Sequence, residues 1–216
     1  MAKKFTPQDL PQTIPVFPLP GALLLPNARL PLNIFEPRYL TMVEDVLKTP
    51  DRLIGMVQPL AAPDGDTNSL HQIGCAGRII SFVETDDNRN QILLQGVSRF
   101  RIGETHNSFA PYVKADVSWD SFSSDLERLG PDHGFDRPHF LNLIERFFKA
   151  RDLSSDMETL READEELLIN SLAMMCPFSI EEKQALLEAP DLENRRETLV
   201  MILEFALHEQ ENRPMQ

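Results

Sequence analysis

The chain has 216 residues, 42% of them hydrophobic and 25% charged, which is enough to bury the core of one large domain or two small ones. Its formal net charge of −13 is uneven: residues 1–120 hold 11 basic and 13 acidic side chains, whereas residues 121–216 hold 10 and 21. An acidic surface repels phosphate, which argues against nucleic acid and anionic membranes as partners.

The first residues carry Lys3 and Lys4 but no apolar run of the kind that an export signal needs. No apolar run approaches the ~20 residues that a membrane-spanning helix requires. The two cysteines, Cys75 and Cys176, are a hundred residues apart, and we expect buried, reduced thiols. These features predict a cytoplasmic protein.

Residues 14–58 contain three predicted strands. The apolar run at 14–19 is the first, and Pro20-Gly21 predicts the turn that follows it. The second is 29–35, in which apolar side chains alternate with others, as in a half-buried strand: Leu30, Leu32 and Ile34. Pro31 has no N–H, so we expect this strand at a sheet edge or at a bulge. Residues 53–57 form the third.

A helix is predicted over residues 38–48. Proline suits the first helical position, and an acid there favours the positive end of the helix dipole, so Glu36-Pro37 marks the start. We expect the apolar stripe to consist of Leu40, Val43 and Leu47. Thr49-Pro50 ends the helix.

Two segments of this stretch carry a family resemblance. Residues 15–19 read PVFPL, and residues 34–39 read IFEPRY. They resemble the Lon N-terminal domain, the substrate-binding domain of the ATP-dependent protease Lon, which is also found in cereblon and as a stand-alone bacterial protein. Further matches at Gly96–Ile102 and 179–195 extend the resemblance to roughly 14–207. The resemblance implies a substrate-binding module and says nothing of a chemical activity.

The rest of the first half reads as strands. Gly74 and Gly77 lack side chains, so neighbouring backbones can approach them closely. Strands are predicted at 78–83, 91–97, 98–103 and 112–119, with a turn at 86–90 and a loop at 59–69. In the last strand Tyr112, Lys114 and Asp116 alternate with Val113, Ala115 and Val117, the pattern of a strand.

The second half reads as helices. A first stripe consists of Phe140, Leu143, Ile144, Phe147 and Phe148, and a later one of Leu168, Leu172 and Met175. Thr159–Glu162 and Ser179–Glu182 fit capping boxes, in which hydroxyl and carboxylate groups satisfy free N–H groups at a helix start. Asp191 is expected to cap a last helix with the buried face Leu192, Leu199, Leu203 and Ala206.

The expected fold class is α+β. A strand-rich lobe, a small partly open barrel or pair of sheets with one helix packed on it, precedes a helical bundle lobe. The expected segments are an N-terminal extension 1–13, the β-rich lobe 14–120, a linker 121–137, the helical lobe 138–210 and a tail 211–216.

No motif for catalysis or metal binding stands out. A P-loop needs a lysine directly after a glycine, and no lysine here follows one. No segment resembles the Ser-Lys protease domain of Lon. His71 and Cys75 are four residues apart, but no zinc-type spacing surrounds them. We therefore expect no enzyme activity, no cofactor and no metal, and we interpret acid pairs such as Glu165-Glu166 as helix-start or solvated residues.

The motif at 35–39 has two interpretations. In the structural one, Glu36 caps the helix and Arg38 pairs with a carboxylate or carbonyl to fix the turn. In the functional one, the motif borders a peptide groove between the lobes, together with the strand around residue 100. The residues of that hypothetical peptide-binding site are Phe35, Glu36, Arg38, Tyr39, Arg99, Phe100 and Arg101.

Three functions remain open from the sequence. The leading one is a non-catalytic module that binds unfolded or misfolded polypeptides, with a protease or chaperone as a further partner. The second is a regulatory subunit for one folded partner, and the third is a small-molecule-binding or hydrolytic protein that uses the inter-lobe cleft. An exposed apolar patch favours the first, a flat interface the second, and a deep polar pocket the third. The oligomeric state is open.

Overall fold

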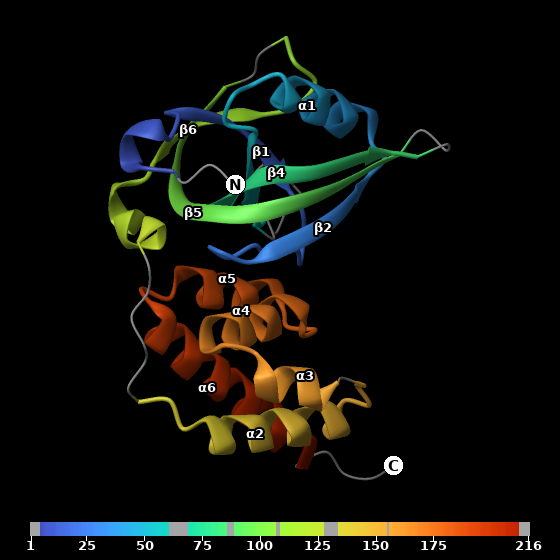
Figure 1. Ribbon diagram of the computed structural model, residues 1–216, viewed down its shortest axis with the longest axis vertical. Helices are drawn as coiled ribbons and strands as arrows, with labels where there is room; N and C mark the ends of the chain where they lie inside the picture. The colour runs from blue at the N-terminus through green and yellow to red at the C-terminus, as the bar shows by residue number, and fades with distance from the viewer. Residues whose placement is uncertain are drawn as a thin grey trace. The chain divides into compact units, whose positions relative to one another are not determined.

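The computed structural model describes residues 5–60, 69–85, 89–106, 109–127, 134–154 and 156–211. The chain is α+β and divides into two compact units, Met1–Leu129 and Gly130–Gln216, called unit 1 and unit 2 below (Figure 1). The expected linker 121–137 includes residues 128–133, which lie outside the described residues; its first part is helical, as the 3-10 helix η2 (Asp120–Leu126).

Unit 1 holds a six-stranded sheet in the part of the chain that the structure describes. Its elements are η1 (Pro7–Asp9), β1 (Thr13–Pro18), β2 (Arg29–Ile34), α1 (Pro37–Leu47), β3 (Leu53–Val57), β4 (Ile73–Glu84), β5 (Asn90–His106), β6 (Lys114–Ser118) and η2. The segments predicted as strands at 91–97 and 98–103 are one continuous strand, β5, because no turn residue interrupts their hydrogen bonding to β4.

The strand order is β2-β5-β4-β3-β1-β6, and β6 pairs with β5 as well as with β1. The pairings of β5, β4, β3, β1 and β6 therefore close into a ring, and only β2 lies outside it. β1 and β3 run parallel, while the other pairs are antiparallel. Because β2 pairs with β5 alone among the described strands, the expectation that the proline-containing strand lies at an edge is confirmed.

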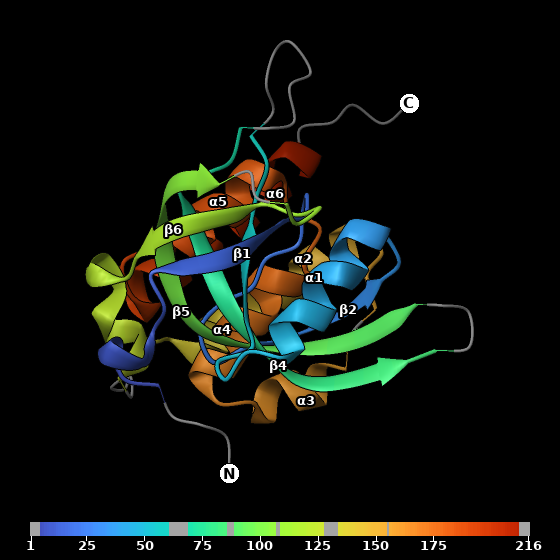
Figure 2. The ribbon, with the colours of Figure 1, turned by 90° about the horizontal axis from the view of Figure 1, so that it is seen from above.

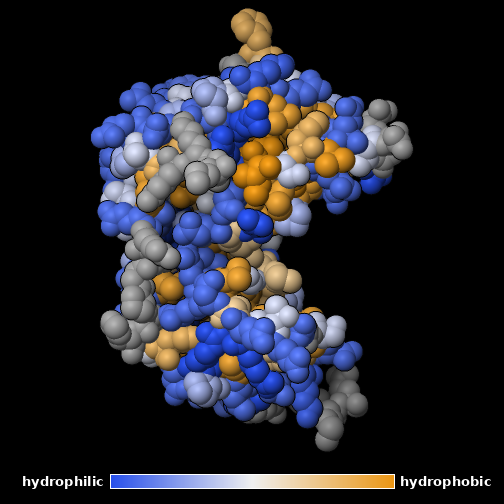
Figure 3. Space-filling model, viewed as in Figure 1, coloured by the Kyte–Doolittle hydropathy of each residue, from blue (hydrophilic) through white to orange (hydrophobic). Residues whose placement is uncertain are grey.

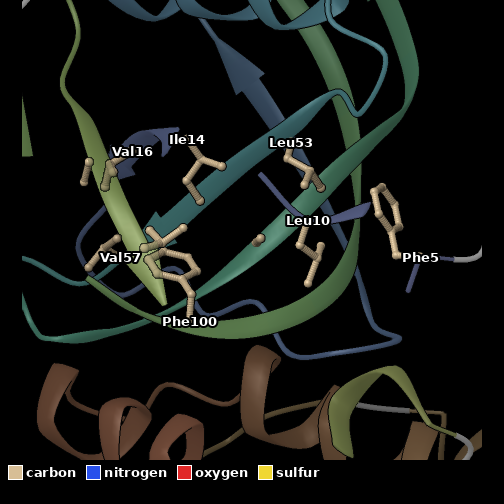
Figure 4. Packing of buried hydrophobic residues seen from close by; sticks show 10 residues of the cluster. Phe5, Leu10, Ile14, Val16, Leu53, Val57 and Phe100 are labelled. Atoms are coloured by element: carbon tan, nitrogen blue, oxygen red, sulfur yellow. The ribbon is translucent and has the colours of Figure 1, made fainter. Parts of the chain in front are cut away.

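The ring encloses an apolar core around Phe100 (Figure 4). Small residues make room for the Phe100 side chain: a Cβ on Gly74 would lie 2.6 Å from Phe100 Cζ and 2.6 Å from the Met56 carbonyl oxygen. The close approach expected at Gly74 is thus confirmed. Trp119 packs edge-on against Phe100 with 5.7 Å between ring centroids. The other buried members of the cluster are Phe5, Leu10, Ile14, Val16, Leu53, Val57, Ala76, Ala115 and Val117.

Three strand segments project from the ring and form what we call the arm: β2, residues 79–84 of β4 and residues 90–95 of β5. In the arm β4 no longer pairs with β3, and β5 pairs with β2 in place of β6. Figure 2 shows β4 and β5 running out together past β2. The pairing register places Leu32, Ile92 and Phe82 side by side across the three strands.

Helix α1 uses a different face from the one expected. Its buried residues are Tyr39, Met42, Val43 and Val46, whereas Leu40 and Leu47 are half-buried. Both stripes have helical spacing and share Val43, but the bulky Tyr39 packs inward against Phe17 and turns the buried face toward its own side.

Unit 2 is helical, with α2 (Arg137–Ala150), α3 (Met157–Glu162), α4 (Glu165–Met175), α5 (Ile180–Glu188) and α6 (Leu192–Glu211). The expected stripes on α2 and α6 are buried, except that Phe148 is half-buried. The capping box at Ser179 is confirmed, since the Glu182 N–H donates to Ser179 Oγ at 3.1 Å and the Ser179 N–H to Glu182 Oε2 at 2.7 Å. Asp191 accepts the N–H of Asn194, so its capping role is also confirmed.

Two predictions for unit 2 are wrong. Thr159 does not begin a helix: Asp156 caps α3, because its carboxylate accepts the N–H groups of Glu158 and Thr159. A stronger cap three residues upstream therefore displaces the expected one. Met175 is exposed although it shares a face with Leu172, because α4 ends there and the following Cys176 is buried in its place.

A buried guanidinium links three helices of unit 2. Arg195 of α6 donates from Nε to the Leu186 carbonyl at 3.0 Å and from Nη1 to Asn170 Oδ1 at 3.1 Å. The hydrogen bonds offset the cost of burying its charge, and they fix α4, α5 and α6 to one another.

Candidate functional site

The turn at residues 35–39 combines an exposed ring with an exposed ion pair. Pro37 occupies the first helical position of α1, and Glu36 is the N-cap residue, although its side chain does not cap the helix. Instead Glu36 Oε2 accepts from Arg38 Nε at 2.9 Å and Nη2 at 2.8 Å. Phe35 precedes this pair and is 63% exposed. The structural interpretation of Arg38, pairing with a carboxylate, agrees with this geometry.

Tyr39 belongs to the core of unit 1. Its ring packs on Phe17 with 4.2 Å between centroids, and the Arg38 guanidinium lies 4.6 Å from the Tyr39 centroid. Burial raises the pKa of the Tyr39 phenol. The positive charge of Arg38 lowers this pKa, and the negative charge of Glu36 raises it further, but both effects are smaller than that of burial. Tyr39 therefore offers little contact surface to a peptide.

Arg99 is buried and ion-paired, which corrects the expectation that it lines a groove. Its side chain is 2% exposed, and it forms a two-pronged contact with Asp125 of η2, Nη2 to Oδ1 at 2.7 Å and Nε to Oδ2 at 2.9 Å. The backbone N–H of Arg99 also donates to Asp125 Oδ2. The Phe122 ring covers the guanidinium at 4.7 Å. This arginine fastens η2 to β5.

Phe100 is likewise not a surface residue, since it is fully buried at the centre of the ring core. The sequence hypothesis placed Phe100 in the peptide-binding site, but its side chain belongs to the apolar core cluster of unit 1. Arg101 is exposed, and its Nη1 donates to Gln72 Oε1 at 3.0 Å.

The structure does not bring the two halves of the predicted site together along the sheet. Ile34 pairs with Asn90, so the turn at Phe35 lies at the start of β5, whereas Phe100 lies ten residues further along the same strand. At about 3.4 Å per residue that separation is roughly 34 Å of strand. Of the seven predicted residues, those with exposed side chains near the turn are Phe35, Glu36 and Arg38.

The structure instead gathers other hydrophobic residues near Phe35. On β4 they are Ile80, Phe82 and Val83, of which Phe82 is 38% and Val83 51% exposed. The register sets residues 82–84 of β4 beside 90–92 of β5 and 32–34 of β2, so they share the end of the arm with Phe35. Figure 3 shows a hydrophobic area on unit 1 between α1 and the β4–β5 hairpin. We call Phe35, Ile80, Phe82 and Val83 the arm patch.

Sequence reasoning missed the β4 part of the arm patch. The run from Arg78 to Val83 predicts a strand, and a strand of this composition is ordinarily covered on at least one face. The available signal was length: β4 and β5 are 12 and 17 residues long, whereas β3, the neighbour of β4 in the ring, has five. A hairpin that is longer than the strands beside it leaves the residues at its outer end exposed.

One further polar contact of unit 1 is structural. Tyr112 donates its hydroxyl to Asp45 Oδ2 of α1 at 3.0 Å, and burial together with that carboxylate raises the pKa of Tyr112 to about 12. Within the described residues, no cluster of three or more His, Cys, Asp or Glu side chains is placed to hold a metal ion. Cys75 and Cys176 are buried free thiols, as expected. None of the described helices is both long enough and apolar enough to cross a bilayer.

Comparison with known proteins connects this architecture to one family. The family model described as the ATP-dependent protease La (LON) substrate-binding domain matches residues 13–204. Lon protease 2 of Myxococcus xanthus is 29% identical over 91% of this chain, and Lon protease of Dictyoglomus thermophilum is 28% identical over 91%. The chain spans about a quarter of the length of these relatives, 24% and 25% respectively.

Solved structures agree with this match. The crystal structure of a Lon N-terminal domain protein from Xanthomonas campestris has a TM-score of 0.61 and 28% identity, covering 88% of this chain and 97% of that one. The N-terminal domain of Mycobacterium avium complex Lon protease has the same TM-score with 13% identity, which supports the fold. With its family model matched along most of its length, this chain belongs to the LON substrate-binding domain family.

Proposed function

We propose that this chain binds exposed apolar segments of unfolded or misfolded polypeptides, without cutting them, and that the arm patch is the contact surface. The family supports a substrate-binding role, and the names of the relatives suggest that the substrates are polypeptides destined for proteolysis. A protease or chaperone would then receive what this chain holds.

The observation that carries the proposal is the exposure of the arm patch. Phe35, Phe82 and Val83 lie at the same end of the three-stranded arm, with Phe82 and Val83 on opposite faces of the sheet because side chains alternate along β4. Exposed hydrophobic residues that gather in one place mark interaction sites more often than scattered ones do. Binding to an apolar patch does not require one particular sequence, so such a patch suits a protein that binds many different unfolded chains.

The charged pair beside the patch limits which chains bind. Glu36 and Arg38 neutralise each other at 2.8 Å, so the part of the rim beside Phe35 presents no net charge. Hydrophobic segments flanked by either sign of charge would be tolerated there. The arm patch thus favours apolar content over charge pattern.

The test uses the full chain and fluorescence anisotropy with a labelled, reduced and carboxymethylated protein as the unfolded probe. Phe35→Ser and Phe82→Ser should each weaken binding about tenfold or more, because burying a phenylalanine contributes about 1.5–3 kcal/mol. The matched control is Phe205→Ser: Phe205 of α6 in unit 2 is also 63% exposed, and its loss should leave affinity unchanged.

Two results would reject the proposal. One is wild-type protein that fails to bind the unfolded probe better than the native form of the same probe. The other is an equal loss of affinity in all three variants, which would make the binding non-specific adhesion. Melting temperatures of the variants exclude unfolding as the cause of a loss.

A further inference from the structure

One face of α6, the last helix of unit 2 (Figure 1), carries exposed hydrophobic side chains. Met201 and Phe205 are 61% and 63% exposed, although the opposite side of the same helix is buried through Leu199, Leu203 and Ala206. The two exposed residues are four positions apart, so their side chains are neighbours on the helix surface. Both sides of this helix are therefore apolar, and the structure covers one of them.

The spacing along the exposed face is that of one helix packed on another. Thr198, Met201, Phe205 and His208 follow each other at intervals of three, four and three residues, the repeat of side chains that interlock with a facing helix. The Thr198 hydroxyl donates to the Asn194 carbonyl at 2.8 Å, so its proton already has a partner within α6. We call Thr198, Met201, Phe205 and His208 the α6 stripe.

Glutamates flank the α6 stripe on both sides. Glu197 and Glu204 lie four and three residues from Met201, and Glu209 lies four residues from Phe205, so each is about one turn away on the helix surface. All three glutamates are exposed. The second half of the chain has the same sign of charge, since residues 121–216 hold 10 basic and 21 acidic side chains. A partner therefore meets apolar side chains bordered by negative charge.

The two arginines of α6 do not offset this charge at the stripe. Arg195 is buried, and its guanidinium donates to the Leu186 carbonyl and to Asn170. Arg196 is half-buried, and its Nη2 lies 4.0 Å from Glu193 Oε1. Both guanidinium groups are thus engaged within unit 2.

A second copy of α6 does not supply the positive charge that the flanks lack. In an antiparallel pair of helices each flank faces the same flank of the other helix, so Glu197 and Glu204 would meet the same glutamates. In a parallel pair each flank faces the opposite one, so Glu204 would meet Glu209 of the other copy. A shift in register brings no cation opposite them, because α6 has no exposed lysine or arginine among its residues of described burial, 192–209.

We propose that the α6 stripe binds a basic amphipathic helix of a folded partner protein. Apolar side chains of the partner, spaced by three and four residues, would pack on Met201 and Phe205, and its lysines or arginines would face the glutamates of the flanks. Complementary charge attracts such a helix, and like charge rejects an acidic one. The surface belongs to unit 2 and includes no residue of the arm patch, so this inference does not rest on the proposed function.

The test uses the full chain and three labelled synthetic peptides of about four heptads each. The first has leucine at the two apolar positions of each heptad and lysine at the flanking positions, the second has glutamate in place of the lysines, and the third is a scrambled form of the first. Like charges on the flanks keep each peptide from pairing with itself. In fluorescence anisotropy the lysine peptide should bind at least about tenfold more tightly than either of the others.

Variants of the chain locate the contact. Phe205→Ser should weaken binding of the lysine peptide about fivefold or more, because it removes apolar area from the stripe. Glu197→Lys combined with Glu204→Lys should reverse the preference, so that the glutamate peptide binds more tightly than the lysine peptide. The matched control is Glu145→Lys, a charge reversal at an exposed glutamate of α2, which should keep the preference of wild type. Phe35→Ser should leave affinity within about twofold of wild type.

The two binding assays separate the two surfaces. The carboxymethylated probe used for the arm patch carries added negative charge, so the glutamates of α6 repel it and Phe205→Ser remains a valid control there. If the unfolded probe does not bind while the reversal of peptide preference is observed, the proposed function falls and the present inference stands.

Three results would overturn the inference. The first is equal binding of the lysine peptide and its scrambled form, which would show attraction by charge alone. The second is a Phe205→Ser variant that keeps the melting temperature and the peptide affinity of wild type. The third is a wild-type dimer in sedimentation that Phe205→Ser dissociates, which would show that a second copy covers the stripe.

Discussion

The ring and the arm of unit 1 are built from the same two strands, yet one buries its aromatic residues and the other exposes them. Phe100 of β5 is fully enclosed, because β6 and β3 close around it and glycine opposite leaves room for the ring. Among the described strands Phe82 of β4 pairs with β5 alone, and it remains partly exposed. Composition is similar in the two regions, so the number of neighbouring strands decides whether a side chain holds the fold or meets a partner.

The comparison predicts its largest effect at Phe100. Phe100→Ala should lower the free energy of unfolding by about 3–5 kcal/mol, since it leaves a cavity in a closed core. Trp119, the single tryptophan, packs on Phe100, so its fluorescence during urea denaturation reports on unit 1. If the variant does not fold, Phe100→Leu should give a smaller loss of about 1 kcal/mol. A normal urea midpoint for Phe100→Ala would contradict the enclosure of this ring.

The second effect concerns the buried ion pair. Asp125→Ala should cost about 3 kcal/mol, because it leaves the Arg99 guanidinium buried without its carboxylate. Replacing both partners, Arg99→Met with Asp125→Leu, should recover most of that loss. If the double variant were as unstable as the single one, the arginine would contribute mainly through its other contacts, such as that with Phe122.

The third prediction tests a link between α1 and the segment that leads into β6. Tyr112→Phe removes the hydrogen bond to Asp45 and should lower stability by about 1–2 kcal/mol at pH 7. The folded pKa of Tyr112 is raised from 10.0 to about 12, so the stabilisation is complete below pH 10 and is lost as pH rises toward 12. Wild type should therefore lose stability over that window, and the phenylalanine variant should lose less. Parallel alkaline melting curves would contradict the assignment.

The smallest effect is expected in the arm. Val83→Thr should change the free energy of unfolding by no more than about 0.5 kcal/mol, since exposed substitutions rarely do more. The same urea titration followed through Trp119 measures this. A loss of 2 kcal/mol or more would show that the arm patch is covered in the folded protein, and would remove the basis for its role in binding.

The sequence predicted the elements well and the site poorly, for one physical reason. Strand and helix periods are local, so Pro31 at an edge, the cap at Ser179 and the buried Ala115 and Val117 of β6 could be inferred from neighbouring residues. Burial of Arg99 and Phe100 depends on ring closure by β6 and on η2, which are distant in the chain. Local patterns do not reveal which strands outrun their neighbours, and so they did not reveal the arm patch.

The pairing that closes the ring also determines the order in which parts of unit 1 can fold during synthesis. Thr13 of β1 pairs with Asp116 of β6, so more than a hundred residues separate the two strands that meet there. Until β6 has left the ribosome, the edge of β1 that it will cover has no partner, although α1 and the β4–β5 hairpin can form from local contacts. A contact of such long sequence separation forms slowly, because the loop-closure entropy comes first. The nascent chain of this protein therefore passes through a stage in which it presents an open strand edge of its own, the same kind of surface that unfolded chains offer to others.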